Sequence, residues 1–298
     1  MNTPQPPNDT LLLQLKTLRL SGILVTLEAR HRQAVSSEWS YVEFLSRLLE
    51  DEIERRAQKQ LDVRLRRGAI NTTKTLEDFS FAFNPNINRQ QVMALAACDF
   101  IREKRNLLVC GPSGVGKSHL AQALGQEACR QGFEVLFIST HKMLQHLLGG
   151  RADNSYERRL GTYLRPDLLI LDDFGLRSLA HPAPDDLYEV INERYEKGSI
   201  LLTSNRSPKE WASLFNDPLL ASAGIDRLGD RAEMLVIRGE SYRSHGRARS
   251  DIGARSDISA RSDISARIDE QSSSPGSLSP GSLSPQSSKG EENPPAAR

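Results

Sequence analysis

The sequence has few cysteines, and it lacks the patterns that mark secreted and membrane proteins. Its three cysteines, Cys98, Cys110 and Cys129, include no pair at C-x-x-C spacing, so neither a disulfide framework nor a zinc site is indicated. Residues 1–8 are polar and rich in proline, without the basic and then apolar order of a secretory signal. No run of apolar residues approaches the roughly 18 that a membrane span requires. These absences predict a cytoplasmic protein that has no membrane partner.

Net charge is almost absent as well. Lys and Arg number 39 and Asp and Glu number 38, which gives a formal net charge of +1. A protein without a strong overall field binds nucleic acid only through a local basic patch. The 298 residues are enough for one large domain or for a domain with an appendage.

Three regions differ in their patterning. We expect residues 1–76 to form a small all-α domain, because apolar residues recur near helical spacing and residues 38–65 contain neither Gly nor Pro. Residues 77–246 alternate short apolar runs with amphipathic stretches. Residues 247–298 repeat Arg-Ser-Asp-Ile and then Ser-Pro-Gly-Ser-Leu, a composition that buries too little apolar area to offset chain entropy. We therefore expect a disordered tail, most simply a repeat expansion without function.

The middle region has the pattern of an α/β fold. Five apolar runs are expected to be strands: 106–110, 133–138, 168–171, 200–203 and 234–237. Three longer stretches are expected to be helices: 117–130, 142–148 and 185–196. Apolar strands that alternate with helices indicate a parallel sheet that is covered on both faces.

One stretch of the middle region fits a phosphate-binding loop. Residues 111–118 read Gly-Pro-Ser-Gly-Val-Gly-Lys-Ser, which matches G-x-x-x-x-G-K-[ST]. They follow an apolar strand and open an amphipathic helix, as this motif requires. Its glycines let backbone N–H groups approach phosphate oxygens, and the helix N-terminus adds partial positive charge. Lys117 is expected to reach the β- and γ-phosphates, and Ser118 to offer its hydroxyl to Mg²⁺.

The residues predicted to bind ATP are therefore Gly111, Pro112, Ser113, Gly114, Val115, Gly116, Lys117 and Ser118. His119 is placed with them because it follows directly in the chain. A lone histidine on the first turn of a helix is, however, more often a packing or capping residue than a catalyst.

Two carboxylates end the third apolar run. Residues 168–171 are all apolar and Asp172 and Asp173 follow, so both carboxylates are expected at the carboxyl edge of a buried strand, where ligands bind in open α/β sheets. Asp172 is predicted to hold Mg²⁺, directly or through water, and Asp173 to orient and deprotonate the attacking water. An isolated Asp-Asp pair is often just a solvated strand end, but the phosphate loop earlier in the chain favours the catalytic interpretation.

Further polar residues follow the fourth apolar run. Asn205 is expected to bridge the γ-phosphate and the attacking water, although capping the helix after Ser207 is an equal alternative. Arg227 is the predicted arginine finger, because a hydrolytic ATPase needs positive charge at the transferring oxygens, often from a neighbouring subunit. A surface arginine paired with Asp226 is the alternative for that residue. Arg243 is a second candidate phosphate sensor.

Together these motifs resemble the AAA+ family and, within it, the IstB-like ATPases. Those are helper proteins of a bacterial insertion-sequence transposase and relatives of the DnaC helicase loader. The stretches 15–22, 41–49 and 116–125 are similar to the same proteins, and the resemblance covers about residues 11–243. The acidic strand ends in Asp-Asp rather than Asp-Glu, which is typical of the helper and loader branch.

The resemblance implies an ATPase that oligomerises on duplex DNA when ATP is bound, helps to choose the target and activates the transposase. It also implies that the N-terminal domain promotes assembly and partner contact, and that Arg227 acts in trans. Two other functions stay open. One is a helicase loader, whose main act is to bind another protein. The other is a small-molecule kinase, which is disfavoured because Asp173, Asn205 and Arg227 suit attack by water.

Two groups of basic residues are candidates for DNA contact. They are Arg55, Arg56, Lys59, Arg64, Arg66 and Arg67 in the first group, and Lys142, Arg151, Arg158 and Arg159 in the second. Neither group has interleaved aromatic residues, so single-strand base stacking is not indicated. Contact with the backbone of duplex DNA, without sequence readout, suits them better. The commoner alternative for such charge runs is a solvated helix face.

Overall fold

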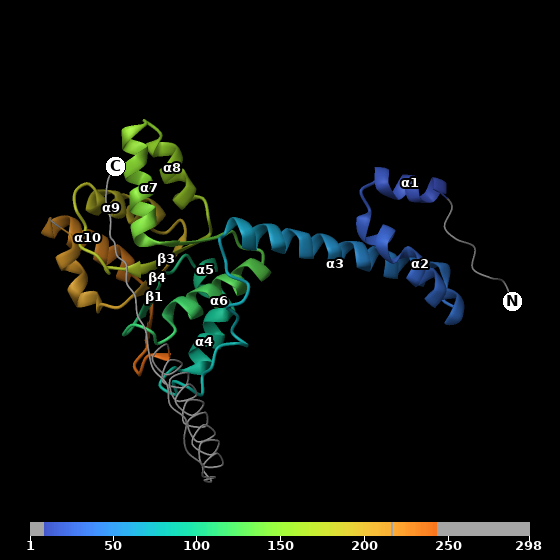
Figure 1. Cartoon of the computed structure of the whole chain (residues 1–298), viewed down its shortest axis with the longest axis horizontal. Coiled ribbons are helices and arrows are strands. Elements are labelled where there is room, and N and C mark those ends of the chain that lie inside the picture. The colour runs from blue at the N-terminus through green and yellow to red at the C-terminus, as the bar shows by residue number, and fades with distance from the viewer. Residues whose placement is uncertain (1–8, 216, 243–298) are drawn as a thin grey trace, which may run out of the picture. The chain divides into compact units, whose positions relative to one another are not determined.

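The computed structural model describes residues 9–215 and 217–242 of the chain (Figure 1). Residues 1–8, Asn216, Arg243 and the tail expected over 247–298 lie outside the described residues, and the domain limits at 76 and 246 stay predictions. The helices are α1 (Asp9–Thr17), α2 (Ser21–Ser36), α3 (Tyr41–Arg67), α4 (Arg89–Ala96), α5 (Asp99–Arg102), α6 (Lys117–Arg130), α7 (Thr140–Ala152), α8 (Tyr156–Leu164), α9 (Ala183–Arg194), the 3₁₀ helix η1 (Pro208–Leu214) and α10 (Pro218–Gly229). The strands are β1 (Leu107–Cys110), β2 (Val135–Ser139), β3 (Leu168–Phe174), β4 (Ser199–Ser204) and β5 (Glu233–Val236).

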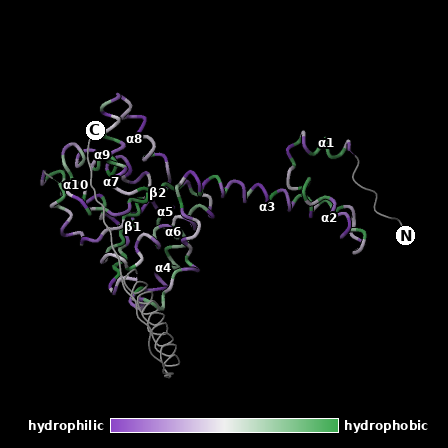
Figure 2. Tube along the Cα trace, viewed as in Figure 1, coloured by the Kyte–Doolittle hydropathy of each residue, from purple (hydrophilic) through white to green (hydrophobic). Residues whose placement is uncertain are grey.

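The first described part of the chain is entirely helical, as the sequence predicts. The long helix expected over 38–65 is present as α3, which starts later because the hydroxyl of Ser40 caps it by accepting the N–H of Glu43. Figure 2 shows α3 as a mainly hydrophilic helix, so its packing depends on a few apolar positions. The small core that α3 shares with α1 and α2 consists of Leu15, Ile23, Leu27 and Leu48.

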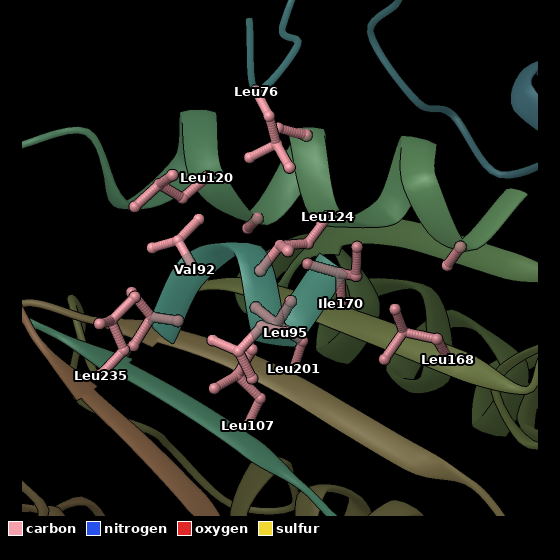
Figure 3. Close-up of a cluster of buried hydrophobic side chains, with 14 of the residues drawn as sticks. Leu76, Val92, Leu95, Leu107, Leu120, Leu124, Leu168, Ile170, Leu201 and Leu235 are labelled. Atoms are coloured by element: carbon pink, nitrogen blue, oxygen red, sulfur yellow. The ribbon is translucent and has the colours of Figure 1, made fainter. Parts of the chain in front are cut away.

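The five strands form one parallel sheet in the order β2-β3-β4-β1-β5. Successive residues of a strand face opposite sides, and in β1 Leu107 and Val109 belong to one buried cluster whereas Leu108 and Cys110 belong to the other. In the first cluster, side chains of α4 and α6 meet those of β1, β3, β4 and β5 (Figure 3). Helices α7, α8 and α9 contribute to the second cluster. The predicted parallel sheet, covered on both faces, is confirmed.

The end of α3 is tied to this sheet. Leu65 and Ile70, on either side of the helix end, belong to the first buried cluster. Between them, the carbonyl of Gly68 accepts a 2.8 Å hydrogen bond from the N–H of Phe137 in β2. The chain is thus anchored at the edge strand before residues 71–84 continue towards the phosphate loop.

Each predicted strand overlaps an observed one, but several helices were missed. The missed helices are α4, α5, α8 and α10. They are 4 to 12 residues long, and such short helices show too few turns for a clear apolar period. None of the helices in the described ranges is long and apolar enough to cross a membrane.

Candidate nucleotide-binding site

A cleft of about 740 Å³ lies at the carboxyl ends of β1, β3 and β4, the edge at which ligands bind in open α/β sheets. Three segments that the sequence predicted to act together meet in its lining: the phosphate loop, the Asp172-Asp173 pair and Asn205. Residues 71–84, which precede α4, contribute a further part of the lining.

The phosphate loop takes the shape that its glycines and lysine require. Lys117, the first residue of α6, is buried, and its Nζ donates to the carbonyl oxygen of Pro112 at 2.7 Å. Gly116 has φ of 102°, and a Cβ at this position would lie 2.7 Å from the Phe79 ring. Both the backbone angle and the close approach therefore favour glycine.

The two ends of the predicted phosphate loop have different positions relative to the cleft. Residues 113–119 line the cleft, whereas Gly111 and Pro112 do not. The N–H of Gly111 donates instead to the carbonyl oxygen of Ser204 at 3.1 Å. The first residues of the loop thus attach it to β4 and leave the rest to face a ligand.

Ser118 and Asp172 lie side by side in the cleft. The Ser118 hydroxyl donates to Oδ1 of Asp172 at 2.8 Å, and Asp172 is 8% exposed. Hydroxyl and carboxylate oxygens suit Mg²⁺, which is commonly held by one or two protein groups together with phosphate oxygens and water. The two residues therefore fit the predicted metal site, and the metal itself stays a prediction.

Asp173 is exposed and also lines the cleft. Its backbone has φ of 55°, in the left-handed region that few residues other than glycine adopt. Its N–H donates to Oγ1 of Thr203 in β4 at 3.1 Å. The residue therefore lies beside the phosphate loop, where a carboxylate can take a proton from water.

Asn205 directly follows β4 and lines the same cleft. The alternative role, as the cap of the next helix, belongs to another residue. Ser207 caps η1 and forms a capping box with Glu210. The position of Asn205 is thus compatible with the predicted contact to the γ-phosphate.

Comparison with known proteins identifies the family. Residues 13–250 match the family described as IstB-like ATP binding protein. A protein of Mycobacterium tuberculosis, described as an ATP-binding protein in an insertion sequence, is 42% identical over 230 residues, which are 77% of this chain and 92% of that protein. The chain belongs to the IstB-like ATP-binding proteins. The resemblance to the IstB-like proteins that the motifs indicated is therefore confirmed.

Other relatives of this IstB-like chain carry similar descriptions. The ATP-binding protein of insertion sequence IS21 in Pseudomonas aeruginosa is 37% identical over 229 residues, which are 77% of this chain and 86% of that protein. Among solved structures, the DnaC helicase loader is 26% identical with a TM-score of 0.43, over 50% of this chain and 91% of that chain.

Arg227 of the IstB-like chain does not line the cleft. It lies on α10, where its Nη1 donates to the carbonyl oxygen of Ala223 at 3.1 Å and its guanidinium lies 5.6 Å from the centre of the Tyr188 ring. Over residues 9–215 and 217–242 it forms no ion pair with Asp226. The role of Arg227 as a finger stays a prediction, and Arg243 lies outside the described residues.

Sequence reasoning missed the contribution of residues 71–84. Phe79 lies against Gly116, and Phe83 packs edge-to-face on Tyr242 with 4.9 Å between ring centres. The run Phe-Ser-Phe-Ala-Phe at 79–83 was the sequence signal for this part of the cleft. Closely spaced aromatic rings provide a flat apolar surface on which the adenine ring of a nucleotide can pack.

His119 packs against the same segment. Its Nε2 lies 2.8 Å from the carbonyl oxygen of Thr75, and its ring meets Phe79 edge-to-face at 5.3 Å. The packing role that the sequence favoured for a lone histidine is therefore observed. His119 also lines the cleft, and its contact with nucleotide stays a prediction.

The two basic groups differ in how many members are paired. Three members have carboxylate partners: Arg56 with Glu52, Arg151 with Asp186 and Arg159 with Asp153. Within the part of the chain that the structure describes, the members without an ion-pair partner are Arg55, Lys59, Arg64, Arg66, Arg67, Lys142 and Arg158. The unpaired members are the better candidates for contact with phosphates.

Proposed function

We propose that this protein hydrolyses ATP and helps a transposase, assembling on duplex DNA when ATP is bound and promoting target selection and transposase activation. The observation that carries the proposal is the meeting of Ser118, Asp172 and Asp173 in one cleft. These residues supply the metal-binding oxygens and the base that hydrolysis needs. Relatives that belong to insertion sequences support the transposition setting.

Each residue of the cleft has a separate task in the proposed reaction. Lys117 exchanges the carbonyl of Pro112 for the β- and γ-phosphate oxygens of ATP. Ser118 and Asp172 hold Mg²⁺, which neutralises phosphate charge when bound. Asp173 accepts a proton from the attacking water, and Asn205 orients that water.

Two features support assembly of several copies. Arg227 lies away from the cleft of its own chain, as expected of a residue that acts on a neighbour's ATP. An apolar stripe on α3, defined as Val42, Leu45, Leu49 and Ile53, is 46% to 76% exposed and follows helical spacing. Gathered exposed apolar side chains mark protein interfaces. We therefore assign assembly and transposase contact to residues 1–76 and ATP hydrolysis to residues 77–246.

Duplex DNA is the proposed surface for assembly. The unpaired basic residues of α3, α7 and α8 contact phosphates rather than base edges, because neither group carries interleaved aromatic rings. Binding through phosphates implies little sequence preference and a strong dependence on salt.

The test is electron microscopy and sedimentation of the full chain with duplex DNA, with and without ATP. We expect oligomers on DNA only with ATP, and their dispersal as salt rises. Lys117→Ala should form none, whereas Lys197→Ala, which removes an exposed lysine in the turn after α9, should behave as wild type. A monomer that ignores nucleotide and DNA would refute the proposal. Capture of the replicative helicase but not the transposase would favour the loader alternative.

A further inference from the structure

Two residues of β3 lie opposite one residue of β4 at the edge of the cleft. Strands β3 and β4 pair residue by residue from Leu168 opposite Ser199 to Leu171 opposite Leu202. The next pair is Phe174 opposite Ser204, so the register shifts by one residue between these two pairs. Asp172 and Asp173 therefore share Thr203 as their neighbour on β4. This is a β-bulge, a feature that re-aims side chains and is over-represented beside active sites.

The hydroxyl of Thr203 contacts both aspartates of the bulge. It accepts a hydrogen bond from the N–H of Asp173 at 3.1 Å, and it donates to Oδ1 of Asp172. The directions follow from the groups, because an amide N–H only donates and a carboxylate only accepts. Thr203 is fully buried, so water does not replace it easily in either bond.

A second buried threonine holds the same peptide group from its other end. The hydroxyl of Thr140, the first residue of α7, donates to the carbonyl oxygen of Asp172 at 3.1 Å. The peptide between Asp172 and Asp173 is thus bonded through its carbonyl to one hydroxyl and through its N–H to another. We call Thr140 and Thr203 the hydroxyl pair.

The backbone of Asp173 needs such support. Its φ of 55° lies in a region that an aspartate adopts only at a cost in free energy, and such conformations persist where the surroundings hold them. Both bonds of the hydroxyl pair act on the peptide that enters this residue. Loss of either bond would free Asp173 to return towards ordinary strand geometry.

We propose that Thr203 is a positioning residue that sets the relation between the two catalytic carboxylates, with Thr140 as its partner. The proposal rests on the proposed hydrolysis of ATP. Thr203 orients the carboxylate of Asp172 towards Ser118 and fixes the backbone from which the side chain of Asp173 extends. Thr203 is fully buried and does not line the cleft, so its loss affects turnover far more than nucleotide binding.

The test compares Thr203→Val, which keeps the shape but removes the hydroxyl, with Thr203→Ser, which keeps the hydroxyl. ATP affinity, kcat and KM for phosphate release, and thermal unfolding are measured on the full chain with duplex DNA. We expect kcat to fall at least about tenfold in Thr203→Val, the loss typical of a hydrogen bond to a charged group. ATP affinity should stay within about twofold, and Thr203→Ser should restore turnover. Thr162→Val, on the exposed side of α8, is the matched control.

Three results overturn the proposal. Wild-type kcat in Thr203→Val would show that the hydroxyl is dispensable. Equal loss in Thr203→Ser and Thr203→Val would show that keeping the hydroxyl does not preserve turnover, and would assign the effect to the shape of the side chain. If Thr203→Val does not fold, Thr140→Val tests the same peptide, and wild-type kcat in that variant overturns the proposal as well. Absence of phosphate release by the wild-type chain is a separate outcome, because it refutes the proposed hydrolysis itself.

Discussion

Ser118 and Asp172 are separated by 54 residues in the chain, yet their side chains share a 2.8 Å hydrogen bond. Ser118 lies in the first turn of the helix after the phosphate loop, and Asp172 directly follows the apolar part of β3. Because the parallel sheet places the ends of β1 and β3 at the same edge, the two motifs form one site.

The first prediction concerns the metal. Asp172→Asn removes a negative charge from the Ser118–Asp172 pair, so the Mg²⁺ concentration for half-maximal ATP binding should rise at least about tenfold. A titration of Mg²⁺ with a fluorescent ATP analogue measures this concentration. Asp185→Asn, a change at an exposed aspartate of α9, is the control. An unchanged Mg²⁺ requirement in Asp172→Asn would remove this residue from the metal site.

The second prediction concerns the base. Asp173→Asn keeps the size of the side chain but cannot accept a proton from water, so turnover should fall by about 10² to 10⁴. ATP binding should persist, and the assembled complex on DNA should outlive that of the wild type. Phosphate release and the lifetime of DNA-bound oligomers are the measurements. Normal hydrolysis by Asp173→Asn would make the assignment of the base wrong.

The third prediction concerns action between subunits. Arg227→Ala should reduce turnover by about 10³ or more if the residue is an arginine finger, and Lys117→Ala should lose nucleotide binding. A mixture of the two variants should regain activity, because each Lys117→Ala chain still offers Arg227 to a neighbour with an intact phosphate loop. If mixing restores nothing at any ratio, Arg227 does not act in trans.

The fourth prediction concerns acid stability of the N-terminal helices. Arg30 of α2 donates to both carboxylate oxygens of Asp51 in α3, and it lowers the pKa of Asp51 from 3.8 to about 2. Because the pKa is lower in the folded state, the stabilisation is present above about pH 4 and is lost as pH falls towards 2. Asp51→Asn should therefore destabilise the helices by about 1–2 kcal/mol at neutral pH and by progressively less in acid.

Tryptophan fluorescence measures this difference. Trp39 lies beside the start of α3, whereas Trp211 is buried against the sheet, so urea unfolding in a Trp211→Phe background follows the N-terminal helices. Glu28→Gln, which removes an exposed carboxylate of α2, is the control. A stability difference between the parent chain and its Asp51→Asn variant that stayed constant from pH 7 to pH 2.5 would contradict the assignment to this ion pair.

Much of the site was predictable because its motifs are local. The phosphate loop requires a strand before it and a helix after it, and α6 has the predicted bounds, Lys117–Arg130. Asp172 and Asp173 were recognisable because an uninterrupted apolar run precedes them. The topology of a parallel sheet then brings both motifs to one edge.

The features of the site that the sequence did not predict depend on contacts between segments that are distant in the chain. The role of Thr203 follows from its register opposite β3, which no local pattern reports. Residues 71–84 have no regular helix or strand, so periodicity did not reveal that Phe79 and Phe83 belong to the cleft. Arg227 was proposed from its motif and its role stays a prediction, whereas its helix α10 was missed because a short helix that contains glycine has a weak signal.

The bulge at Asp172 and Asp173 has a consequence beyond the cleft, because one extra residue shifts the alternation of a strand. Leu169 and Leu171 face the second buried cluster, and in a regular strand Phe174 would face the first. Phe174 instead belongs to the second cluster, where its ring meets Trp211 at 5.0 Å. The strand thus accommodates a second carboxylate without disturbing the layer beneath it. Deletion of Asp173 would restore the regular alternation and leave Phe174 on the side of the second cluster, where Trp211 lies.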